Sequence, residues 1–85
     1  MKKIKIQNPV VEIDGERMGE QIVGPVSGAA AEAGLVAGDV IVAVDDLPVS
    51  RLNTVAIMLK DYSDGSTADL TIIRQGEIQE IDVTF

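Results

Sequence analysis

Residues 27–44 decide the fold of this 85-residue chain, and they read S-G-A-A-A-E-A-G-L-V-A-G-D-V-I-V-A-V. The alanine-rich half predicts a short helix capped by Ser27, because a serine oxygen accepts a hydrogen bond from the unpaired N–H groups of a helix start. Gly34 predicts the end of that helix, since glycine adopts the left-handed conformation that follows a last turn. Residues 40–44 are apolar without interruption and mostly β-branched, which is typical of a buried central strand.

The turn between this helix and this strand carries three residues with expected structural roles. Gly34 and Gly38 stand where the chain must reverse direction, so both are expected at positive φ. Asp39 immediately precedes the strand, and its carboxylate is expected to accept backbone N–H groups of the turn. The sequence suggests no partner base for Asp39, so we interpret it as structural rather than catalytic.

A second, longer helix is predicted over residues 51–61, with Ser50 as its cap. Its apolar residues recur at spacings of three and four, as on one face of a helix. The members of this stripe are Leu52, Val55, Ala56 and Leu59. Val55 is expected to point towards the core.

Shorter apolar segments predict strands on the N-terminal side of residues 27–44. One strand is expected before a turn at residues 14–16, with an interruption at Asn8-Pro9 because proline lacks an N–H group. Another strand is expected over residues 22–26, although Pro25 lies within it.

The C-terminal half predicts further strands. Asp45-Asp46 is read as a turn, followed by a short stub at residues 47–49. Two final strands, around residues 70–72 and 78–85, are joined by Gln75-Gly76, a dipeptide with the glycine expected of a tight hairpin. The whole pattern predicts an α+β fold of five to six short strands with two helices.

The composition excludes several classes of function. The chain has no Cys and no His, which removes thiol nucleophiles, imidazole bases and zinc sites built on these residues. Fourteen acidic against seven basic residues give a net charge of −7, and this field repels nucleic acids and anionic membranes. The acidic pairs Asp45-Asp46 and Asp61/Asp64 are read as solvated turn residues, since no loop spaces oxygen ligands as a calcium site does. We therefore expect no enzyme, no cofactor and no bound metal.

No targeting segment is recognisable. The start Met1-Lys2-Lys3 is basic like the beginning of a signal peptide, but no apolar run of the required length follows it. No stretch is apolar enough to span a bilayer. The expected location is cytoplasmic if the chain is complete, and open if it is an excised domain.

The motif A-G-L-x-x-G-D-x-I at residues 33–41 resembles the signature of PDZ domains, particularly the bacterial type found in high-temperature-requirement serine proteases and intramembrane metalloproteases. The resemblance covers residues 19–85. It implies a partly open β-barrel or sandwich and a single domain over residues 1–85. It also implies a module that binds apolar C-termini or extended segments of other proteins, by adding a strand between residues 10–13 and the helix 51–61.

The same resemblance implies where a ligand is bound. The loop that holds a ligand carboxylate falls at residues 7–10, but this loop has no glycine, and Pro9 removes one N–H donor from it. The loop is therefore either functional, with Asn8 substituting in part, or damaged. An apolar Leu52, where many PDZ domains have His, implies an apolar ligand side chain. The implied peptide-binding residues are Asn8, Val10, Val11, Glu12, Ile13, Leu52, Ala56 and Leu59.

Residues 1–18 are similar to the start of NADP-dependent isocitrate dehydrogenases, with K-I-K-I-Q-N-P-V-V-E-I-D-G-E-R-M as the matching stretch. None of that enzyme's substrate, metal or cofactor motifs follows, so the similarity implies a chimeric or recombined chain rather than a dehydrogenase. The alternative to peptide binding is a ligand-free folded scaffold with a non-functional carboxylate loop. A weak self-association through Phe85 is also open, because Val83-Thr84-Phe85 has the apolar pattern of a ligand.

Overall fold

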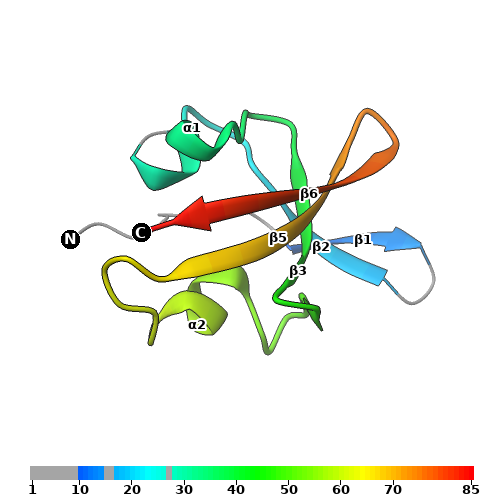
Figure 1. The fold of residues 1–85 in the computed structure, drawn as a ribbon. Coiled ribbons are helices and arrows are strands. Elements are labelled where there is room, and N and C mark those ends of the chain that lie inside the picture. Colours follow the sequence, from blue (N-terminus) through cyan, green and yellow to red (C-terminus); the bar gives the residue numbers. More distant parts are fainter. Residues whose placement is uncertain (1–9, 15–16, 27) are drawn as a thin grey trace.

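The computed structural model describes residues 10–14, 17–26 and 28–85, which form one open sheet with two short helices (Figure 1). The elements in chain order are β1 (Val10–Asp14), β2 (Arg17–Gln21), α1 (Ala29–Ala33), β3 (Val40–Val44), β4 (Leu47–Pro48), α2 (Val55–Leu59), β5 (Thr67–Arg74) and β6 (Glu77–Thr84). All pairings are antiparallel, in the order β1-β2-β3-β5-β6, and β4 pairs with β3. The expected α+β class is confirmed. Neither described helix is long and apolar enough to cross a membrane.

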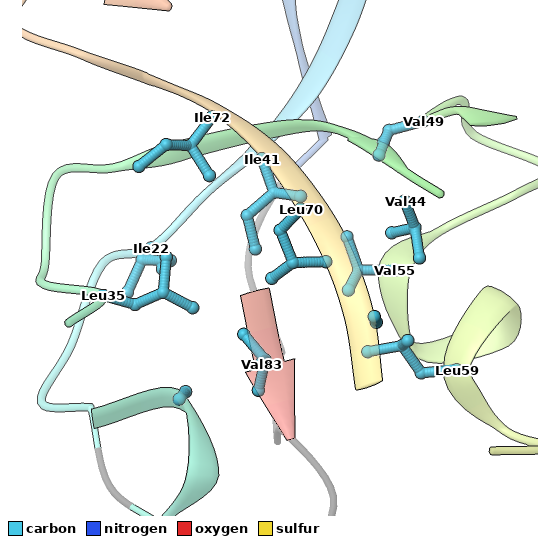
Figure 2. Close-up of a cluster of buried hydrophobic side chains, with 12 residues drawn as sticks. Ile22, Leu35, Ile41, Val44, Val49, Val55, Leu59, Leu70, Ile72 and Val83 are labelled. Carbon is cyan, nitrogen blue, oxygen red and sulfur yellow. The ribbon is translucent and has the colours of Figure 1, made fainter. Parts of the chain in front are cut away.

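Strand β3 lies at the centre of the sheet, as the apolar run predicts. It pairs with β2 on one side and β5 on the other, with Ile41 opposite Ile72 and Val44 opposite Leu70. These side chains pack with residues of both helices and of β6 (Figure 2). The buried cluster consists of Ile22, Ala30, Leu35, Ile41, Val44, Val49, Val55, Leu59, Ala68, Leu70, Ile72 and Val83.

One tight turn joins β3 to β4, and another joins β5 to β6. Asp45 and Asp46 have φ of 49° and 67°, and Gln75 and Gly76 have φ of 52° and 82°. Positive φ at both central residues is the geometry that matches the twist of a two-residue hairpin, and aspartate tolerates it better than most residues. Both predicted turns are confirmed.

The end of α1 also follows the prediction. Gly34 has φ of 99°, and its N–H reaches the carbonyl groups of Ala30 and Ala31. Gly38 has φ of 98°, which confirms the second expected glycine turn. Ser27 lies outside the described residues; the position before α1 belongs to Gly28, which provides no side-chain cap.

The strand expected at residues 22–26 is wrong, because the strand that pairs with β3 is Arg17–Gln21. Gly19 favours this choice: a Cβ atom there would lie 2.5 Å from Val40 Cγ1 and 3.1 Å from the Ile41 carbonyl oxygen. Only glycine allows β2 to approach β3 this closely without displacement. Ile22 still contributes to the core. Its backbone hydrogen bonds with Gly38 and Asp39 close the turn before β3 and are not part of the β2–β3 pairing.

The helix expected over residues 51–61 is shorter, covering only Val55–Leu59. Thr54 is its cap, with Oγ1 accepting a hydrogen bond from the Ile57 N–H at 3.3 Å. Ser50 Oγ instead accepts from the Asn53 N–H at 3.0 Å, within a turn that the two backbones also close. The sequence holds two residues that can cap a helix, and the first of them is used by this turn.

Candidate functional site

Strand β1 forms one edge of the sheet, because among the described strands it pairs with β2 alone. The register places Val10 opposite Glu20, Val11 opposite Gly19 and Glu12 opposite Met18. An edge strand presents a row of backbone N–H and C=O groups that another extended chain can pair with. The predicted binding residues Val10, Val11, Glu12 and Ile13 all lie in this strand. Asn8 lies outside the described residues.

The three residues predicted on the helix do not form one surface. Ala56 is exposed in α2. Leu59 is only 1% exposed and belongs to the core, so its side chain offers almost no surface to a ligand. Leu52 is 85% exposed and precedes the helix, in the turn at residues 50–53. Val55 is buried, as predicted.

Ile57 is an exposed apolar residue of α2 that the helical stripe did not include. Its side chain is 47% exposed and follows directly after Ala56. The later start of α2 changes which positions face the solvent, and only the structure gives that start. Ala56 and Ile57 are therefore the exposed apolar residues in the helix itself. We call the outer edge of β1 together with these two residues the β1–α2 site.

Glu20 links the strand next to β1 with the start of α2. It lies in β2 opposite Val10, is 2% exposed, and its Oε1 accepts a hydrogen bond from the Val55 N–H at 2.9 Å. Burial raises the pKa of the Glu20 carboxyl, and the hydrogen bond from Val55 offsets part of this rise. No local pattern in the chain predicts this contact, because the two residues are 35 positions apart.

Asp39 has the structural role predicted for it. Its Oδ2 accepts the Val36 N–H at 3.0 Å, and its two oxygens receive Arg74 Nε at 2.8 Å and an Arg74 terminal nitrogen at 2.7 Å. The same Arg74 nitrogen also donates to the Gly34 carbonyl. Arg74 holds the pKa of Asp39 below its usual range despite the burial of the carboxyl. This bidentate pair joins the α1–β3 turn to the end of β5.

The acidic turn at Asp45-Asp46 also has a structural explanation. Asp45 accepts hydrogen bonds from the Tyr62 hydroxyl and from the Asp69 N–H. The Tyr62 bond lowers the pKa of Asp45, and the pKa of Tyr62 rises in return. Within residues 10–14, 17–26 and 28–85, no group of three or more His, Cys, Asp or Glu side chains is arranged to hold a metal ion.

Phe85 is held against its own domain. Its N–H donates to the Ser66 carbonyl at 3.0 Å, and its carbonyl accepts the Gly65 N–H. Its ring meets Tyr62 edge to face, with centroids 6.0 Å apart. Insertion of Phe85 into a second molecule would have to break these contacts, and self-association through Phe85 stays a prediction.

A small antiparallel sheet that ends in an edge strand, with a short helix bonded to the next strand, is typical of a class of protein-interaction modules. Residues 15–85 match the PDZ domain family, and the chain belongs to that family. PDZ domains are generally peptide-binding modules of protein–protein interaction, and they are typically non-catalytic.

Two curated relatives are both described as probable periplasmic serine endoprotease DegP-like. The one from Bartonella henselae is 34% identical over 68 residues, which are 80% of this chain and 14% of the relative. The one from Pseudomonas savastanoi pv. phaseolicola is 37% identical over 57 residues, which are 67% of this chain and 12% of the relative. The chain thus spans about one seventh to one eighth of their length.

A solved structure, an aminopeptidase N family protein from Idiomarina loihiensis, shares the fold with a TM-score of 0.69 at 23% identity. The likeness covers 95% of this chain and 13% of that protein, so it extends into residues 1–18. The suggested dehydrogenase origin of this segment and the chimeric chain are not supported. Strand β1 instead pairs with β2 as part of the PDZ sheet.

Proposed function

We propose that this chain binds an extended peptide by strand addition along the outer edge of β1, with the exposed face of α2 contacting alternate ligand side chains. The observation that carries the proposal is the position of β1. It is an edge strand, and Glu20 on the neighbouring strand contacts the first residue of α2. This contact links α2 to β2, the strand that pairs with β1, and so supports the assignment of the ligand to the edge of β1 and to α2.

The ligand is an apolar C-terminus or an extended apolar segment of another protein. Ala56 and Ile57 present apolar surface on the helix, and Leu52 presents more just before it. The net charge of −7 favours ligands with Lys or Arg upstream of the apolar residues. The chain itself performs no catalysis in this proposal; any protease activity would belong to other parts of a longer protein.

The test is an amide chemical-shift titration of the ¹⁵N-labelled chain with a synthetic peptide, Lys-Lys-Ser-Val-Val-Phe with a free C-terminus. We expect the largest shifts in β1 and α2. An amidated version of the same peptide measures how much the carboxylate contributes: equal binding of both forms indicates recognition of an extended segment rather than of a C-terminus. Shifts confined to other strands would contradict the proposal.

A pair of matched variants locates the contact on the helix. Ala56→Asp places a charge on the exposed face of α2, and Ala31→Asp places the same charge on an exposed position of α1. Figure 1 shows the two helices on opposite sides of β5 and β6. We expect only Ala56→Asp to weaken binding. If no peptide binds the unmodified chain, the ligand-free scaffold becomes the better description.

A further inference from the structure

Glu20 is a carboxylate buried where the two parts of the β1–α2 site meet. Its neighbours in the sheet are apolar, Val10 across from it in β1 and Ile41 in β3. Its Oε1 accepts the Val55 N–H, while its Oε2 is buried and has no hydrogen-bond partner among the described residues. Burying a carboxylate with only one hydrogen bond is unfavourable, and an apolar residue would avoid that cost.

The contact supplies α2 with a second cap, from a group on another element. The first N–H groups of a helix have no partner within the helix. In α2 the Thr54 side chain satisfies Ile57, but the Val55 N–H is satisfied by Glu20 on β2. Val55 and Leu59 pack α2 against the core, and a cap on the helix's own segment would add nothing to that attachment. A cap on β2 fixes the distance between the first turn of α2 and the strand next to β1.

We propose that Glu20 is a positioning residue for peptide binding: ionised, it holds the start of α2 at the spacing from β1 that a ligand strand requires, and when it gains a proton this hold weakens and affinity falls. The inference rests on the proposed function. A neutral acceptor forms a weaker hydrogen bond than a carboxylate, which is the physical basis of the change.

Several features suit Glu20 to respond to pH. Burial raises its pKa above the usual value for Glu. The elements packed around it offer few competing charges, since β3 (VIVAV) and α2 (VAIML) contain no titratable residue. On β1, Glu12 is the titratable residue nearest in register, two positions from Val10. On β2 itself the other charged residue is Arg17, three positions away.

Stability and affinity should respond to pH in opposite directions. The folded pKa of Glu20 lies above its unfolded value, so its contribution to stability is fully present below the unfolded pKa and is lost as pH rises through the folded pKa. Protonation therefore stabilises the fold while it weakens the Val55 contact. A residue with a purely structural role would move affinity and stability together.

The experiment compares the unmodified chain with Glu20→Gln and Glu20→Leu between pH 4 and pH 8. Glutamine keeps an oxygen for the Val55 N–H but does not titrate, whereas leucine removes the acceptor. The first readout needs no ligand: the Val55 amide shift should titrate in the unmodified chain and lose that inflection in Glu20→Gln. Glu12→Gln should leave the inflection in place, which assigns it to Glu20.

The second readout is the affinity for fluorescein-labelled Lys-Lys-Ser-Val-Val-Phe. At pH 8 we expect Glu20→Leu to bind about fivefold to tenfold more weakly than the unmodified chain. The affinity of the unmodified chain should fall towards pH 4 relative to that of Glu20→Gln. A Val55 inflection that persists in Glu20→Gln, or equal affinity of Glu20→Leu and the unmodified chain, would overturn the inference.

The two proposals can fail separately. If the unmodified chain does not bind the peptide but the Val55 amide shift titrates with Glu20, the proposed function fails. The contact by which Glu20 positions α2 is then still supported. If the peptide binds but the Val55 amide shift does not titrate with Glu20, the positioning role fails and the proposed peptide binding is still supported. If Glu20→Leu does not fold, the Val55 amide titration of Glu20→Gln and of the unmodified chain still tests the positioning role of Glu20.

Discussion

Replacing Arg74 by leucine should cost this small domain a large part of its stability. Asp39 is 1% exposed, and the Arg74 side chain that pairs with it is 30% exposed. Removing one partner of a buried ion pair costs about 3–5 kcal/mol, because the remaining charge stays buried without compensation. Arg74 is partly exposed to solvent, which screens the interaction, so we expect about 2–3 kcal/mol for Arg74→Leu.

Two further variants separate the contributions of this pair. Arg74→Lys keeps a positive charge but loses the planar fork that contacts both Asp39 oxygens and the Gly34 carbonyl. We expect it to cost about 1–1.5 kcal/mol. Arg51→Leu removes the same charge from an exposed position and should change stability by less than about 0.5 kcal/mol.

The effect of Arg74→Leu should depend on pH. Because Arg74 lowers the pKa of Asp39 in the folded state, the stability from this pair is present above the unfolded pKa, about 3.9 for Asp. It is lost as pH falls through the still lower folded pKa. The difference between Arg74→Leu and the unmodified chain should therefore be largest near neutral pH and shrink in strong acid.

Urea unfolding followed by far-UV circular dichroism measures these differences. For a chain of this size, a slope of about 1 kcal/mol per molar urea converts the expected loss into a midpoint shift of about 2–3 M. A midpoint for Arg74→Leu no lower than that of Arg51→Leu would refute the reasoning. A large shift that is independent of pH would also refute it, because Asp39 would then not be the group responsible.

Three further outcomes are expected. Gly19→Ala should lower the free energy of unfolding by about 1–3 kcal/mol through overpacking against Val40 and Ile41, while Gly24→Ala, whose Cβ would meet no atom within 4 Å, should be nearly neutral in the same urea assay. Affinity for a peptide with upstream lysines should fall when salt is raised from about 0.05 to 0.5 M, and affinity for a peptide with upstream serines should change little; isothermal calorimetry of both decides this. Deleting residues 1–18 removes β1 and the start of β2, so thermal melting should show a marked loss of stability, and an unchanged melting temperature would contradict the role of β1 in the sheet.

The sequence predicted elements that depend on neighbouring residues. The β-branched run of β3, the end of α1 at Gly34 and the hairpin turn at Gln75-Gly76 are each specified within a few positions. Asp39 also behaves as expected towards its own turn. Local conformational preference and backbone hydrogen bonding are sufficient to explain these successes.

The predictions that failed depend on residues far apart in the chain. Strand β2 has no alternating apolar pattern. Gly19 allows its close approach to β3, and Glu20 contacts α2. The start of α2 depends on whether Ser50 or Thr54 acts as cap, and the helix capped by Thr54 is the one whose first N–H is held by Glu20 of β2. For the same reason the candidate site lost Leu59 to the core and gained Ile57.

The two long-range contacts of Glu20 and Asp39 overlap along the chain. Each joins residues 35 positions apart, and the loop closed by one contains an end of the other. A cut between Asp45 and Asp46 would place both acceptors, Glu20 and Asp39, on the first fragment. It would place both donors, Val55 and Arg74, on the second. Neither fragment can form either contact alone, so the chain should fold in an all-or-none manner, and the two fragments should recover these contacts only by associating with each other.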